Sequence, residues 1–194
     1  MEQPFIRALS PEEARAVYRR DIRRDFPPDE IKPWSVIERL HRRERYRCLG
    51  LFAADGLRGY AFFASLPGAA GGKNYLLDYF AILPAFRNGG LGSLFLQKLP
   101  EELTDALLVI GEVENPDYAE NEAQREVREK RLRFYRRCGV SDTGVTSRVW
   151  GVEYRLLDFG GKAPAAPDAV RALYAGFYHV FFPPRVYESK VLIR

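Results

Sequence analysis

The sequence predicts an α/β fold in which helices flank a mixed, largely antiparallel sheet. Short apolar runs alternate along the chain with segments whose apolar residues recur at helical spacing. Asp55-Gly56 separates two neighbouring apolar runs and is a strong two-residue hairpin signal, so these strands are expected to be antiparallel. The chain has 194 residues, of which 46% are hydrophobic and 13% aromatic, so we expect a single globular domain.

The N-terminal part is expected to form one strand and two helices. Residues 4–9 are the candidate strand, and Ser10-Pro11-Glu12-Glu13 is a capping box that begins a helix reaching about Arg24. Pro27-Pro28-Asp29 breaks the chain and starts a second helix. That helix carries apolar residues at helical spacing: Ile31, Trp34, Ile37 and Leu40.

Two strands and a loop should follow this helical pair. Residues 47–54 and 57–65 are the apolar runs on either side of the hairpin signal. The next segment, residues 67–73, is rich in glycine and resembles a phosphate-binding P-loop only superficially. It is one residue short of the required spacing, and Asn74 stands where serine or threonine is needed. We therefore expect a mobile loop between antiparallel strands.

The most informative stretch is residues 75–96, which reads YLLDYFAILPAFRNGGLGSLFL. Residues 75–83 form an aromatic and apolar run that ends at Pro84, as a buried strand would, and a helix should begin at about Gly90. Between them, three glycines allow backbone N–H groups to point outward, next to the positive end of a helix dipole. This arrangement would hold a diphosphate. The alternative is a tight turn that merely lets the helix pack on the strand, while the Rossmann and Walker spacings do not fit.

The second half continues the alternation of strands and helices. Residues 107–113 are a continuous apolar run typical of a buried central strand, and residues 123–137 form a charged helix. Two more strands are expected at 140–147 and 149–157, with Asp142-Thr143-Gly144 as a turn.

A C-terminal helix and strand complete the predicted fold. After a flexible connector at 160–167, a helix should carry an aromatic stripe, ended by Pro183-Pro184, and residues 186–193 form a candidate last strand. The stripe is compatible with a subunit contact or a lid, although packing against the protein's own core is the more frequent arrangement. Its members are Val170, Leu173, Tyr174, Phe177, Tyr178 and Phe181.

Composition argues against several classes of function. There is no run of 18 apolar residues, and the N-terminus lacks a signal-peptide pattern, so we expect a cytoplasmic protein without membrane contact. Cys48 and Cys138 lack the spacing of metal ligands, and no metal is expected. The net charge of +4 is modest and basic residues alternate with acidic ones, so nucleic acid is not an expected partner. A monomer or a homodimer is expected.

Three pieces of the sequence, in the right order within residues 75–157, resemble the GNAT superfamily of N-acetyltransferases. The first is the stretch LPAFRNGGLG, in which Arg87, Gly90 and Gly92 occupy the fixed positions of the acyl-CoA signature R/Q-x-x-G-x-G/A. The second, Glu112–Pro116, is similar to the segment after the family's fifth strand. The third, Arg131–Val140, resembles the R-x-x-F-Y-x-x-x-G-F ending of its next helix.

The resemblance implies a single GNAT-like domain over residues 1–194, with a core at about 1–157 and an extension at 164–194. It implies an enzyme that moves an acetyl group from acetyl-CoA to a primary amine of a small molecule, by direct attack in a ternary complex and without metal. The implied acetyl-CoA-binding residues are Ile82, Arg87, Asn88, Gly89, Gly90, Leu91, Gly92 and Ser93.

The resemblance also implies the catalytic groups. The backbone N–H of Ile82 would stabilise the oxyanion, and Tyr135 would protonate the leaving thiolate, unless it simply packs under the sheet. Glu112 and Glu114 alternate with Val113, so they should project to the same side and supply a general base, unless either faces solvent or caps a loop. Glu114 matches the family segment better. Further candidates are Tyr75, Tyr79 and Asn115.

Two other functions remain open from the sequence. The chain could be an acyl-CoA-binding or regulatory protein without catalysis, or an acetyltransferase that acts on protein N-termini or lysines. A covalent acyl-enzyme route is not expected, because Cys48 falls in a predicted strand and Cys138 at a helix end.

Overall fold

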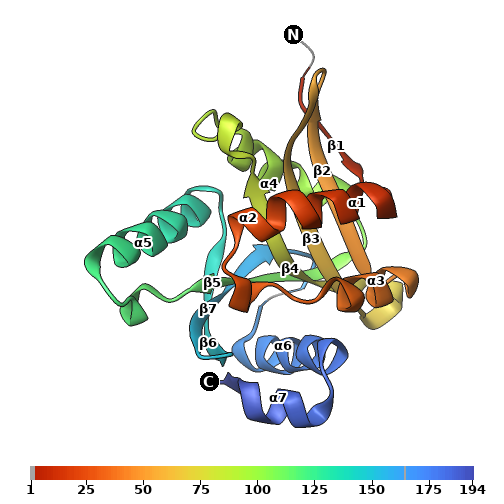
Figure 1. Cartoon of the computed structure of the whole chain (residues 1–194). Coiled ribbons are helices and arrows are strands. Elements are labelled where there is room, and N and C mark those ends of the chain that lie inside the picture. Colours follow the sequence, from red (N-terminus) through yellow and green to blue (C-terminus); the bar gives the residue numbers. More distant parts are fainter. Residues whose placement is uncertain (1–2, 164) are drawn as a thin grey trace. The chain divides into compact units, whose positions relative to one another are not determined.

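A computed structural model describes residues 3–163 and 165–194 (Figure 1). The chain divides into two compact units, which are described separately. The first unit comprises Met1–Ser65 and Leu77–Thr104, and the second comprises Leu66–Leu76 and Asp105–Arg194. Residue 164, in the predicted connector, and the first two residues, which belong to the N-terminus that lacks a signal-peptide pattern, lie outside the described part.

The strands of the first unit form an antiparallel ladder. β1 (Phe5–Ala8) pairs with β2 (Tyr46–Ala53), β2 pairs with β3 (Gly56–Pro67), and β4 (Lys73–Ile82) follows β3 in the sheet order. The β2–β3 hairpin has Ala54 and Asp55 at its turn, because Ala53 pairs with Gly56. The predicted turn is therefore confirmed, one residue earlier than expected.

The first predicted helix is present but changes its geometry along its length. Its capping box is confirmed, since Glu13 N–H donates to Ser10 Oγ at 3.2 Å and Ser10 N–H donates to Glu13 at 2.9 Å. α1 (Pro11–Val17) passes into a π-helical segment (Tyr18–Ile22) and then α2 (Arg23–Asp25). Figure 1 shows these helices lying across β2, β3 and β4.

The second predicted helix begins later than expected. Pro28–Glu30 forms only a 3₁₀ turn, and α3 runs from Trp34 to Arg42. Pro33 explains the delay, because proline disfavours a helical conformation in the residue before it and is tolerated at a helix start. α4 (Leu91–Glu102) packs against β1 and, through Phe95, against Phe80 of β4, with ring centroids 5.5 Å apart.

The second unit contains the remaining strands, in the order β5-β7-β6-β8. β5 (Ala106–Glu114) pairs with β7 (Val152–Gly160), β7 with β6 (Ser141–Val149), and β6 with β8 (Val191–Ile193), all antiparallel. A 3₁₀ turn (Pro116–Tyr118) and α5 (Glu122–Arg137) follow β5. The predicted α/β class, the largely antiparallel sheet and the added C-terminal helix and strand are confirmed.

The predicted turn at residues 142–144 is wrong. The ladder register shifts between Asp142 and Thr146, and Gly144 has φ +74°, so this segment is a bulge inside β6. The hairpin turn lies at Trp150-Gly151, which have φ of 49° and 90°. Both angles are positive, as the favoured two-residue hairpin turn requires, but tryptophan gives no sequence signal for it.

The C-terminal segment holds one helix more than expected. α6 (Pro167–Phe181) carries the aromatic stripe, and its members from Tyr174 to Phe181 are buried, so the stripe packs into the core of the second unit. α7 (Pro184–Lys190) follows, and β8 is correspondingly short. Pro183-Pro184 ends α6 as predicted but also begins α7, because proline suits the first helical position.

Candidate functional site

The glycine-rich junction between β4 and α4 is an open helix N-terminus. A 3₁₀ turn (Pro84–Phe86) leads from β4 to Arg87, after which Asn88 and Gly90 adopt positive φ of 65° and 78°. Gly90 is the N-cap of α4, and no side chain in the described part of the protein caps this end. Apart from its chain neighbours, no described atom lies within 4 Å of the place that a Cβ of Gly90 would occupy.

This opening gives the junction the properties of an anion site. Leu94 N–H donates to Gly90 C=O at 3.0 Å, which is the first bond of the helix, so the N–H groups of residues 91–93 precede the regular ladder. The helix dipole adds partial positive charge at this end. The structure thus brings together the predicted residues Arg87–Ser93 around backbone N–H groups that suit a phosphate.

Ile82 ends β4 just before this junction. The N–H of Leu83 donates to Arg58 C=O in β3 at 2.8 Å, and N–H groups of successive strand residues point to opposite edges, so the Ile82 N–H is directed away from β3. The strands approach closely here. A Cβ at Gly59 of β3 would lie 2.6 Å from Ile82 Cδ1 and 2.8 Å from Ala81 O.

Arg87 is held by two groups that its motif does not reveal. Its Nε donates to Ile82 C=O at 2.9 Å, and its Nη2 donates to Asp25 at 3.2 Å. Asp25, in α2, also accepts from Tyr60 Oη at 3.0 Å, and its side chain is only 6% exposed. Sequence reasoning missed Asp25, whose only signal is an acidic residue at the end of a helix rich in arginine.

Glu112, in the second unit, lies among tyrosine hydroxyls of α6. The hydroxyls of Tyr174 and Tyr178 donate to its Oε1 at 2.5 and 2.6 Å. Ser147 Oγ lies 2.9 Å from the Tyr174 hydroxyl. Burial, together with the nearby Glu112 carboxylate, raises the pKa of both tyrosines well above its ordinary value, so both remain neutral donors.

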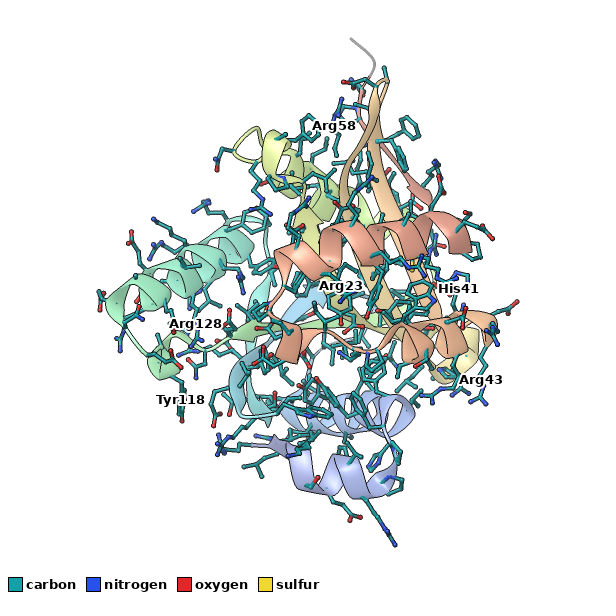
Figure 2. All side chains as sticks on the ribbon, in the orientation of Figure 1. Arg23, His41, Arg43, Arg58, Tyr118 and Arg128 are labelled. Carbon is teal, nitrogen blue, oxygen red and sulfur yellow. The ribbon has the colours of Figure 1, made fainter. Side chains whose placement is uncertain are left out.

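Glu114 lies two residues further along β5 but has charged partners from α5. Arg128 reaches one carboxylate oxygen at 2.7 Å and Arg131 the other at 3.0 Å (Figure 2, in which Arg128 is labelled). Both oxygens of Glu114 are therefore engaged by guanidinium groups. The two glutamates are the predicted pair, yet each has its own set of partners.

Tyr135 is buried on α5. Its ring meets Phe159 of β7 edge-on, with centroids 5.1 Å apart, and burial raises the pKa of its hydroxyl to about 12. Phe159 in turn lies over a glycine, since a Cβ at Gly111 would stand 2.6 Å from its Cε2. The position of Tyr135 thus depends on a strand residue without a side chain.

The three further candidates make hydrogen bonds that stabilise the fold. Tyr79 accepts from Lys32 N–H at 2.7 Å, and Tyr75 donates to Asp105 at 2.8 Å. The Asn115 side chain accepts from Asp117 N–H and from Arg155. Each of these polar groups already has a partner, which favours a structural contribution.

The described residues contain neither a metal-ion cluster nor a membrane-spanning helix. No group of three or more histidine, cysteine, aspartate or glutamate side chains is arranged to hold a metal ion in the described ranges. Within the same ranges, no helix has the length and apolar character needed to cross a membrane.

Comparison of the sequence with protein-family models gives no match, and neither does comparison with curated proteins. Solved structures, in contrast, match well. A protein from Bacteroides thetaiotaomicron that is assigned to the GNAT acetyltransferases has a TM-score of 0.61 and 21% identity, covering 90% of this chain and 94% of its own.

Two other matching structures are enzymes with different acceptors. The Vibrio cholerae spermidine N-acetyltransferase, in complex with CoA and spermine, has a TM-score of 0.56 and 13% identity, covering 80% of this chain and 94% of its own. The Escherichia coli ribosomal-protein-S18-alanine N-acetyltransferase has a TM-score of 0.52 and 19% identity, covering 84% and 95%. At these identities the likeness establishes a shared fold.

Proposed function

From the GNAT fold of this chain, we propose that the protein is an acetyl-CoA-dependent N-acetyltransferase that acetylates a primary amine of a small molecule. The observation that carries this proposal is the open N-terminus of α4, in which Gly90 caps the helix with φ +78° and no side chain fills the space. The match to enzymes such as the spermidine N-acetyltransferase supports it. We expect a cytoplasmic monomer or homodimer that needs neither metal nor nucleic acid.

The junction fits the diphosphate of acetyl-CoA. A diphosphate needs several convergent N–H donors and room for its oxygens, and a glycine junction at a helix N-terminus offers both. Residues 87–93 would hold it, and Ile82 would bind alongside through its outward N–H. When bound, acetyl-CoA supplies an acetyl thioester that is reactive toward amines.

We assign the roles of the side chains from the protons and the negative charge that move during acetyl transfer. Glu112 or Glu114 takes a proton from the substrate ammonium, directly or through water, so that the free amine attacks the thioester carbonyl. The Ile82 N–H donates to the carbonyl oxygen as negative charge develops there. When the carbon–sulfur bond breaks, the Tyr135 hydroxyl gives its proton to the thiolate, and the surplus proton that the attacking nitrogen then loses returns Tyr135 to its neutral form.

Between the two carboxylates, the contacts favour Glu112. Both oxygens of Glu114 are engaged by arginines, whereas the hydroxyls of Tyr174 and Tyr178 both donate to a single oxygen of Glu112, Oε1. A covalent route through cysteine is disfavoured, because Cys48 is buried and burial raises the pKa of its thiol.

Calorimetric titration with acetyl-CoA tests the proposed binding site at residues 87–93, which we call the cradle. Gly90→Asp and Gly90→Asn place side chains of nearly equal shape at the N-cap, and both residue types tolerate a positive φ better than other side chains do. Only aspartate adds a negative charge, so Gly90→Asp should lose more affinity than Gly90→Asn, and both should bind more weakly than wild type. Gly71→Asp is the matched control, since Gly71 has the same φ of +78° and equally open surroundings. Absence of wild-type binding would refute the proposal.

Acetyl transfer itself is tested by thiol release. Polyamines and other small primary amines are compared with peptides that bear a free N-terminus or a lysine. Turnover with small amines alone supports the proposed acceptor class, whereas turnover with peptides alone would replace it by a protein substrate.

A second function is favoured by one observation. Glu114 is fully engaged and Tyr135 is buried, which is also what a CoA-binding protein without catalysis would show. Tight binding of acetyl-CoA without thiol release across the amine panel would favour this second function.

A further inference from the structure

The Arg87 side chain connects three parts of the first unit. It leaves the glycine junction, donates from Nε to the carbonyl of Ile82 at the end of β4, and donates from Nη2 to Asp25 at the end of α2. A guanidinium group has its donors in a fixed planar fork, so these two bonds together fix its orientation. An arginine that served only as a mobile cation for phosphate would not need both.

Asp25 is a buried acid whose other partners hold it in place. Its Oδ2 accepts from Tyr60 Oη at 3.0 Å, and Arg24 donates to both of its oxygens at 3.1 Å. The Asp25 side chain is 6% exposed, whereas that of Arg87 is 49% exposed. The anchored member of the pair is therefore the aspartate, and the arginine is the member that it positions.

Asp25 continues the buried face of its helix. Ala14 and Val17 are buried on the inner face of the helix, and Asp21 continues that face with 1% exposure, within the π segment. Asp25 follows four residues later. Steps of three to four residues keep these positions on one helix face. Burying a carboxylate is costly unless it is paired, which requires partners such as Arg87.

We propose that Asp25 is a positioning residue for the acetyl-CoA site: it fixes Arg87, which in turn fixes the Ile82 end of β4 beside the glycine junction. This inference rests on the proposed function, because it assigns a role within the same cradle. It also assigns Arg87 mainly to holding the protein backbone, with its remaining donors left to face the phosphates.

Substitutions separate this role from simple charge attraction. Asp25→Asn keeps the size of the side chain and removes its charge, and Arg87→Lys keeps the charge but cannot make the forked contacts. If Asp25 and Arg87 position the cradle, each change should weaken acetyl-CoA binding roughly tenfold, which corresponds to about 1.4 kcal/mol. The double variant should be no weaker than the weaker single one, because the two residues act through one contact.

Three results would contradict a positioning role for Asp25. If Arg87 acts only as a cation for phosphate, Arg87→Lys should bind like wild type, and Asp25→Asn should bind more tightly because the arginine is released. Either result overturns the inference. Additive losses in the double variant overturn it as well, since they would show that the residues act independently.

Controls distinguish positioning from a general loss of structure. Arg20→Gln removes an exposed arginine that pairs with the neighbouring Asp21 and should leave the dissociation constant unchanged. Tyr60→Phe removes one donor to Asp25, but the arginines at positions 24 and 87 still hold the carboxylate, so this change should weaken binding less than Asp25→Asn does. Partial unfolding would lower the number of binding sites in the titration without changing the dissociation constant of the folded fraction.

Steady-state kinetics add a readout that unfolding does not reproduce. In Asp25→Asn, the KM for acetyl-CoA should rise together with the dissociation constant, whereas an inactive fraction would lower kcat alone. Wild-type protein that fails to bind acetyl-CoA would refute the proposed function itself. Wild-type binding with an unaffected Asp25→Asn variant would refute only the role of Asp25.

Discussion

Glu112 and Glu114 stand two residues apart on one strand, but their surroundings differ in kind. Glu112 accepts two hydrogen bonds from neutral, buried tyrosines of α6, whereas Glu114 pairs with two arginines of α5. Hydroxyl donors orient a carboxylate through hydrogen bonds, while two guanidinium groups also bring positive charge to it. The comparison teaches that alternation along a strand does not make two carboxylates equivalent, because the helix that each one meets decides its chemistry.

The largest expected effect comes from exchanging these carboxylates for amides. Glu112→Gln should lower kcat by roughly 10²- to 10⁴-fold, as expected for a lost general base, with acetyl-CoA affinity retained. Glu114→Gln should lower kcat by less than about tenfold, because the arginines already occupy its oxygens. Steady-state kinetics with calorimetry measure both. The reverse ranking would make Glu114 the base.

α5 also carries the proposed acid, which extends the comparison to Tyr135. Tyr135→Phe should lower kcat by about 10²-fold if the hydroxyl protonates the thiolate. A donor must be protonated, and burial raises the pKa of Tyr135 to about 12, so the wild-type rate should show no loss from this group below about pH 11. A Tyr135→Phe variant with the wild-type kcat and pH profile would leave the residue a purely structural role.

Losing a partner of Glu112 and losing a partner of Glu114 should also lower the free energy of unfolding by different amounts. Tyr178→Phe leaves the carboxylate of Glu112 with one hydroxyl donor fewer in a buried setting, which should cost about 1–3 kcal/mol of unfolding free energy. Arg131→Gln removes an ion pair whose arginine is 42% exposed, which should cost no more than about 1 kcal/mol. Urea unfolding gives both values. Equal losses of unfolding free energy would show that the Tyr178 hydroxyl stabilises the fold no more than a partly exposed ion pair does.

The smallest expected effect is a loss of stability in alkali. Tyr174 and Tyr178 have pKa values raised well above 10 in the fold, so folding favours their neutral forms. Their contribution to stability is complete below pH 10, the pKa of an unfolded tyrosine, and falls as the pH rises above it. Thermal unfolding between pH 8 and 11 measures the slope, which should be shallower in Tyr178→Phe. An unchanged slope would mean that other groups control alkaline stability.

Local signals in the sequence were sufficient for most elements. The capping box at Ser10, the strand that ends near Pro84 and the glycine junction before α4 all depend on neighbouring residues, and all are present. The wrongly predicted turn has a non-local cause. At residues 142–144, glycine and aspartate gave a turn signal, but the pairing of β6 with β7 absorbed it as a bulge, and the turn formed instead at Trp150. Pairing between strands is not visible in a local pattern.

The same limit applies to the site. The motif predicted an open glycine junction before α4, because this backbone conformation follows from glycine itself, while its binding of acetyl-CoA stays a prediction. It did not predict that Asp25, 62 residues before Arg87 in the chain, would hold that arginine. Nor did it predict that α6 would supply the tyrosines on Glu112, although the aromatic stripe itself was evident. Such contacts depend on tertiary packing.

The absence of a side chain at Gly111 should constrain how this protein evolves. The ring of Phe159 fills the space that a side chain at 111 would need, and Tyr135 rests against that ring. A substitution at 111 would displace the ring and, with it, the proposed acid, so these three positions should change together in descendants of this chain or not at all. A lineage that has gained a side chain at 111 is therefore expected to have moved its proton donor elsewhere.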